Sequence, residues 1–106
     1  MNSLPLITIV IVNDNGKKYL ERTLAALTDQ SYPNFEILVV DNGSTDGSLE
    51  YIKSLQELIL IQSPIVRNKN FACNYGIIQA KGDLILLMDN DLLITDNNLL
   101  TKKKKK

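Results

Sequence analysis

Two aspartates with one residue between them, Asp89-Asn90-Asp91, directly follow the last apolar run of the chain. In extended backbone, residues i and i+2 project to the same side about 6 to 7 Å apart, so both carboxylates can address one ligand. Oxygen ligands of this kind suit Mg²⁺ or Mn²⁺, which keep several waters and complete their coordination with substrate phosphates. Asp89 and Asp91 are therefore predicted to bind a divalent cation together with a diphosphate.

Polar residues also end two earlier apolar runs. Asp41 follows the run at residues 37–40 and opens a polar, glycine-containing turn, and Asn13 ends the first run of the chain. Ligands of open parallel α/β sheets bind at the edge where the strands end. The candidate binding residues on this edge are Asn13, Asp41, Asn42, Ser44 and Asp89. The alternative, that such residues only form turns by bonding to nearby backbone, stays open.

The rest of the pattern supplies the elements that would position these residues. Nearly continuous apolar runs predict four buried strands, at residues 6–12, 35–40, 58–61 and 84–88. Apolar residues at three- and four-residue spacing predict three helices, at residues 17–30, 49–55 and 71–78. This alternation predicts an α/β, Rossmann-like fold with a mainly parallel sheet and helices on its faces.

Length and charge exclude several classes of protein. A chain of 106 residues with 44% hydrophobic content can form one core but not two ordinary domains. Five of its twelve basic residues form the terminal run Lys102–Lys106. The chain before this run has seven basic and twelve acidic residues, which gives it a net charge of −5. We therefore expect no nucleic-acid partner. The G-x-x-x-x-G-K-[ST] and G-x-G-x-x-G phosphate loops are also absent, so phosphate would be bound through metal.

The cysteine content and the first apolar run bear on location. Cys73 is the single cysteine and the chain has no histidine, which excludes an internal disulfide and a nitrogen–sulfur metal cage. The first apolar run is far shorter than the roughly 20 residues that a membrane span needs, so no transmembrane segment is predicted. The sequence favours a cytoplasmic location, with the cytoplasmic face of a membrane as the alternative.

Three stretches resemble the nucleotide-binding half of family 2 glycosyltransferases of the GT-A fold, namely ITIVIVNDNGKKYLERTLAAL, QSYPNFEILVVDNGSTDGSLEYI and AKGDLILLMDND. The resemblance covers nearly all of residues 5–100. It implies that a nucleotide-diphospho-sugar binds with a divalent cation, Mn²⁺ or Mg²⁺, for transfer to an unknown acceptor. It also implies that Asp41 binds the base, that Asp89 lies near ribose and metal, that Asp91 coordinates the metal, and that Asn13 lines the nucleotide pocket.

Two departures from the family pattern bear on donor binding. Asp14 stands where the family often has an aromatic residue before Asn-Gly, and its charge near the expected diphosphate predicts weaker binding. The segment RNKNFACNYGI, residues 67–77, looks shortened between Phe71 and Asn74. Arg67 could contact a phosphate or could simply be solvated, and solvation is the favoured alternative.

The resemblance also predicts how the chain is divided. Residues 1–101 would be the nucleotide-sugar-binding portion of a GT-A domain, and residues 102–106 a polylysine tail. Family members continue into a half that binds the acceptor and, in inverting enzymes, supplies a base, so we expect a truncated product without a catalytic residue. Such a chain is predicted to self-associate through an exposed sheet edge. A non-catalytic nucleotide-binding or inert fragment is the alternative, and a phosphoacceptor receiver domain is disfavoured because the first strand lacks an acidic pair.

Overall fold

The computed structural model describes residues 4–30, 32–55 and 58–89. Strands and helices alternate along them as the sequence predicts. The elements are β1 (Ile7–Asn13), α1 (Lys17–Thr28), β2 (Phe35–Asp41), α2 (Ser48–Lys53), β3 (Ile59–Gln62), α3 (Lys69–Gln79) and β4 (Leu84–Asp89). No helix in these ranges has the length and apolar character that crossing a bilayer requires.

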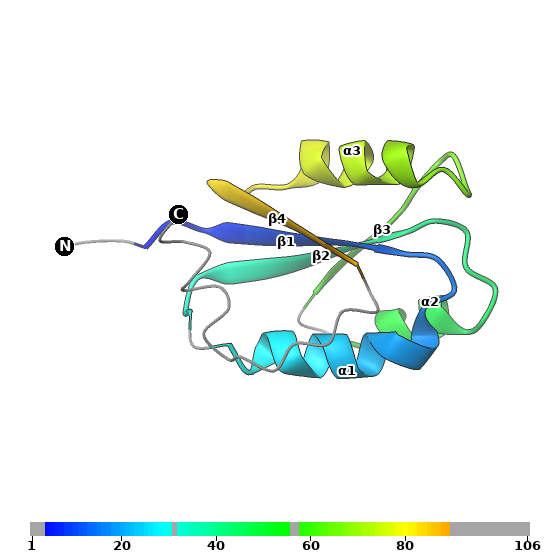
Figure 1. The fold of residues 1–106 in the computed structure, drawn as a ribbon, viewed down its shortest axis with the longest axis horizontal. Coiled ribbons are helices and arrows are strands. Elements are labelled where there is room, and N and C mark those ends of the chain that lie inside the picture. The colour runs from blue at the N-terminus through cyan, green and yellow to red at the C-terminus, as the bar shows by residue number, and fades with distance from the viewer. Residues whose placement is uncertain (1–3, 31, 56–57, 90–106) are drawn as a thin grey trace.

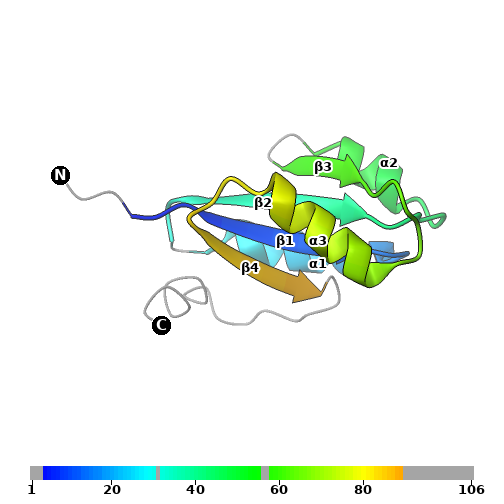
Figure 2. The same ribbon diagram turned by 90° about the horizontal axis from the view of Figure 1, so that it is seen from above.

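The four strands form one parallel sheet in the order β3-β2-β1-β4, which confirms the predicted α/β architecture (Figure 2). The chain builds outward from β1 through β2 to β3, and then returns to the far side of β1 with β4. The direction of winding therefore reverses between β1 and β4. In open α/β sheets this reversal creates the crevice at which ligands bind, beyond the carboxyl ends of the strands.

Helices cover both faces of the sheet, with α1 and α2 on one side and α3 on the other (Figure 1). Alternate residues of β1 serve the two layers: Ile9 and Ile11 pack into the core that includes Leu20 of α1, whereas Val10 packs with Ala72 of α3. Because both faces of β1 and β2 are covered, both strands read as nearly continuous apolar runs in the sequence.

The helix α3 lies directly against the sheet because it has a glycine where it crosses β1 and β2. A Cβ atom at Gly76 would come within 2.7 Å of Val10 Cγ1 and 2.8 Å of Val40 Cγ2. Asn68 caps the start of the helix by accepting a hydrogen bond from the backbone N–H of Phe71 at 3.0 Å. Residues 67–77, the segment that looks shortened in the sequence, thus still contribute to a capped helix. This helix begins near the carboxyl ends of the strands.

The strand β4, like β3, lies at an edge of the described sheet and is less covered than β1 and β2. Within the described residues it pairs only with β1. Ile85 and Leu87 are 42% and 49% exposed, whereas Met88 belongs to the core on the α1 side. The sheet therefore has an apolar, largely exposed strand on the β4 side of the described structure.

Candidate functional site

The turn after β2 is built on the carboxylate of Asp41, which is only 4% exposed. One of its oxygens, Oδ2, accepts hydrogen bonds from the backbone N–H groups of Gly43 at 3.2 Å and Ser44 at 3.0 Å. Gly43 has a φ of +90°, a conformation that favours glycine. Asp41 thus does form the turn, as the alternative interpretation of the sequence held, and its second oxygen faces β1.

Asn13, at the end of β1, completes this cluster. Its Nδ2 donates to Asp41 Oδ1 at 3.1 Å and to Ser44 Oγ at 3.0 Å, while its Oδ1 accepts from the backbone N–H of Gly16 at 3.2 Å. The parallel register makes these contacts possible, because it places Asn13 directly opposite Asp41. Three of the predicted site residues therefore form one hydrogen-bonded cluster, which we call the Asn13–Asp41–Ser44 cluster.

Asn42 is turned toward a different segment. Its side chain is 2% exposed, and its Oδ1 accepts from the backbone N–H of Asn68 at 3.2 Å. Its carbonyl oxygen accepts from the backbone N–H of Arg67, also at 3.2 Å. Asn42 thus fixes the loop that leads into α3, and its predicted part in nucleotide binding stays a prediction. Arg67 itself is exposed and adopts a positive φ of 58°.

The turns after β1 and β2 are also joined near the surface. The backbone N–H of Asn15 donates to Ser44 Oγ at 2.9 Å, and Asn15 Oδ1 accepts from the backbone N–H of Thr45 at 2.7 Å. Asn15 has a φ of 55°, which asparagine tolerates better than most residues. Asp14 beside it is exposed, so its charge lies at the surface of this edge.

Asp46 connects the second turn to the starts of two helices. Its carboxylate accepts from the backbone N–H of Lys17 at 3.0 Å, from that of Ser48 at 2.9 Å, and from the Ser48 hydroxyl. Desolvation tends to raise the pKa of Asp46, but these hydrogen bonds to the charged form outweigh it and hold the pKa below its usual value. The two turns are consequently fixed relative to each other and to α1 and α2.

The sheet register brings Asp89, the first residue of the predicted metal motif, to the same edge. Asp89 is the last residue of β4 and pairs with Val12, the residue before Asn13. The side chain of Asp89 and the residues beyond it, Asp91 included, lie outside the described residues. Among the residues that are described, no three acidic, cysteine or histidine side chains are grouped so as to hold a metal ion.

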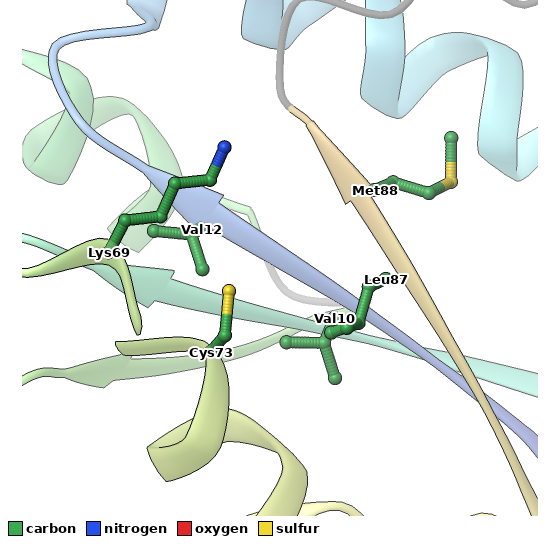
Figure 3. Close-up of a pocket in the computed structure, with 6 residues that line it drawn as sticks. All are labelled: Val10, Val12, Lys69, Cys73, Leu87 and Met88. Carbon is green, nitrogen blue, oxygen red and sulfur yellow. The ribbon is translucent and has the colours of Figure 1, made fainter. Parts of the chain in front are cut away.

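A pocket of about 230 Å³ opens beside this edge, between α3 and β4 (Figure 3). Sequence reasoning did not find it. Its lining residues are Val10, Val12, Lys69, Cys73, Leu87 and Met88. Lys69 is the charged member of this set, and it directly follows Asn68, the capping residue of α3, which begins near the carboxyl ends of the strands. A lysine at the start of a helix that begins at this edge of the sheet is the sequence feature that could have indicated this residue.

Comparison with known proteins decides the family. The sequence model of Glycosyl transferase family 2 matches residues 8–102. The chain belongs to this family. Among curated proteins, it is 33% identical to an uncharacterized glycosyltransferase of Haemophilus influenzae and 36% identical to the glycosyltransferase GlyG of Streptococcus pneumoniae. The matches take in 92% and 91% of this chain, but only 40% and 33% of those two proteins.

Solved structures of glycosyltransferases share the fold. S. aureus TarS 1-349 in complex with UDP matches with a TM-score of 0.80 and 26% identity over 93% of this chain and 31% of that one. The mannosyltransferase PcManGT from Pyrobaculum calidifontis, in complex with GDP-Man and Mn²⁺, matches with a TM-score of 0.79 and 27% identity over 91% of this chain and 30% of that one. The family 2 and GT-A predictions are thereby confirmed, and the chain spans about a third of the length of these neighbours.

Proposed function

We propose that this chain binds a nucleotide-diphospho-sugar at the carboxyl edge of its sheet, for transfer of the sugar to an acceptor. Residues 1–101 would then be the nucleotide-sugar-binding portion of a GT-A domain. The observation that carries the proposal is the Asn13–Asp41–Ser44 cluster, which is held rigidly beside the point where the winding of the sheet reverses. The complexes of two structural neighbours with UDP and with GDP-Man support it.

The hydrogen bonds of Asp41 suit a role in binding the base. A carboxylate offers about four acceptor positions, and the turn and Asn13 use three of them. One position on Oδ1 is then available to accept an N–H group from a nucleobase. Because Asn13, Gly43 and Ser44 hold the carboxylate in one orientation, little side-chain freedom would be lost when the base binds.

A divalent cation fits the donor set at the end of β4. Asp89 and Asp91 supply only carboxylate oxygens, which Mg²⁺ and Mn²⁺ prefer, and Asp41 is already committed to its turn. The bound cation would neutralise negative charge on the departing diphosphate. Asp89 and Asp91 would hold it, while Asp41 orients the base, so the two ends of the donor would be bound by different strands.

Binding measurements test this proposal. Calorimetric titration with UDP and with GDP should give tighter binding in Mn²⁺ or Mg²⁺ than in chelator, and Asp91→Ala should remove most of that difference. Asp41→Asn should weaken binding about tenfold or more in both conditions, because it removes a charged acceptor. Asp29→Asn, an exposed aspartate after α1, is the matched control. Equal affinities in metal and in chelator would rule out the role of the cation.

We also propose that the β4 edge mediates self-association. Ile85 and Leu87 expose apolar surface on a strand that pairs only with β1 within the described residues, and such strands tend to pair with other chains. Sedimentation equilibrium should show association that Leu87→Lys reduces. A monomer at all concentrations would contradict this. The cytoplasmic location stays a prediction from the sequence.

A further inference from the structure

The pocket between α3 and β4 lies one strand position from the Asn13–Asp41–Ser44 cluster. Its floor includes Val10 and Val12, and Val12 directly precedes Asn13 in β1. Val12 also pairs with Asp89 in β4, so the pocket borders both the proposed base site and the first residue of the predicted metal motif. It therefore lies at the reversal point of the sheet, on the face that α3 covers.

Lys69 brings the positive charge to this pocket. Figure 3 shows its side chain extending from the start of α3 toward β1, alongside Val12, with Cys73 one turn further along the helix. The other lining residues are apolar or, in the case of Cys73, a thiol. The first turn of α3 contains no acidic residue. The positive end of the helix dipole at the start of α3 also favours an anion nearby.

We propose that Lys69 is a donor-positioning residue whose ammonium group binds a phosphate oxygen of the nucleotide-diphospho-sugar. This inference rests on the proposed function. With the base at Asp41 and the diphosphate directed toward β4, the phosphates would pass the mouth of this pocket. Lysine binds phosphate as a flexible point charge, so it can follow the diphosphate without a fixed fork geometry.

Lys69 is better placed for this role than Arg67, the cation that the sequence offered. Arg67 lies in the exposed loop before α3 and does not line the pocket, whereas Lys69 does. A structural role for Lys69 would instead depend on its aliphatic stem, which covers apolar surface near Val12. The two roles can be separated, because Lys69→Met keeps a long apolar side chain and removes only the charge.

Calorimetry with matched ligands tests the charge. In Mn²⁺, Lys69→Met should weaken binding of UDP or GDP about tenfold or more, while uridine or guanosine binding stays within about twofold. Lys69→Arg should retain most of the diphosphate affinity. Lys53→Met, at the exposed end of α2, is the matched control and should change neither affinity. Unchanged thermal unfolding of each variant would show that its fold is intact.

Cys73 provides a second readout, because it is the single cysteine of the chain and lines the same pocket. The diphosphate that binds should slow alkylation of Cys73 by iodoacetamide, and the matching nucleoside should not, since only the phosphates reach the pocket. Equal protection by both ligands would overturn the inference.

The outcomes separate this inference from the proposed function. If the wild-type chain binds UDP or GDP and Lys69→Met has the same ratio of diphosphate to nucleoside affinity, the role of Lys69 is overturned and the proposed function is not. A wild-type chain that binds neither diphosphate would contradict the proposed function, and this inference with it.

Discussion

Exchanging the side chains of Asn13 and Asp41 is the sharpest test of the cluster that we place at the centre of the site. Asp41→Asn alone puts an amide where a carboxylate accepts from Asn13, Gly43 and Ser44. Either orientation of the introduced amide leaves its N–H₂ group facing another donor: the Asn13 amide in one case and the two backbone N–H groups in the other. A buried donor is then left without an acceptor.

The expected loss follows from these contacts. One unsatisfied buried group costs about 1 to 3 kcal/mol, and exchanging charge-assisted hydrogen bonds for neutral ones adds to this. We therefore expect Asp41→Asn to reduce the free energy of unfolding by about 2 to 4 kcal/mol, a large part of the roughly 5 to 15 kcal/mol typical of a domain. The exposed Asp29→Asn should change it by less than about 0.5 kcal/mol.

The double variant Asn13→Asp/Asp41→Asn should recover much of this loss. The amide now at position 41 would donate to the carboxylate now at position 13. That carboxylate would accept from the backbone N–H of Gly16, as the Asn13 amide oxygen does in the wild type. The Ser44 hydroxyl, which accepts from Asn13 in the wild type, would turn and donate to the same carboxylate. Urea unfolding followed by circular dichroism gives the coupling energy from the four variants. A coupling energy of at least about 1 kcal/mol is expected, whereas additive losses would refute the cluster as a unit.

Three further predictions concern the packing and the ionisable groups. Gly76→Ala should lower the free energy of unfolding by about 1 to 3 kcal/mol, because the new methyl group would overlap Val10 and Val40. Asn74→Ala, on the exposed side of the same helix, is the control and should leave the free energy of unfolding nearly unchanged in urea unfolding. Because the pKa of Asp46 is lowered in the folded state, its carboxylate stabilises the fold above its unfolded pKa, and this stabilisation is lost as pH falls through the lower folded pKa. In urea unfolding at a series of acid pH values, Asp46→Asn should therefore lose less stability over that range than the wild type does. Burial, and secondarily the charge of Asp83, raise the pKa of Tyr32. The neutral phenol therefore stabilises the fold below the unfolded pKa near 10.0, and this stabilisation is lost as pH rises through the higher folded pKa. Tyr32→Phe should accordingly lose less stability at alkaline pH than the wild type does. An unchanged alkaline unfolding curve for Tyr32→Phe would contradict this assignment.

The sequence predicted the alternation of elements well because the sheet is covered on both faces. Strands such as Ile7–Asn13 then carry apolar side chains toward both helix layers and read as continuous runs. The order of the strands, and with it the reversal beside β1, could not be derived from alternation alone. The helix predicted over residues 17–30 ends at Thr28, because Asp29 leaves the helical register and forms the cap.

The polar residues that end the strands could be predicted from the sequence, but their contacts could not. Polar residues at strand ends pointed to Asn13 and Asp41, and the parallel register placed them opposite each other. Nothing in the sequence showed that Asn42 would turn toward the loop before α3, since that contact depends on where the loop returns to the sheet. Lys69 was missed for the same reason: its place in a pocket depends on how α3 lies across β1.

We propose that the sheet edge at Asn13 and Asp41 binds a nucleoside diphosphate. Titration of ¹⁵N-labelled chain with UDP and with GDP, each in the presence of Mg²⁺, tests it most directly, because backbone amide shifts report where a ligand binds. We expect saturable shifts for the amides of Gly43 and Ser44, which bond to Asp41, and little change for Lys53 at the end of α2. Shifts confined to other surfaces, or no saturable shifts with either nucleotide, would contradict it.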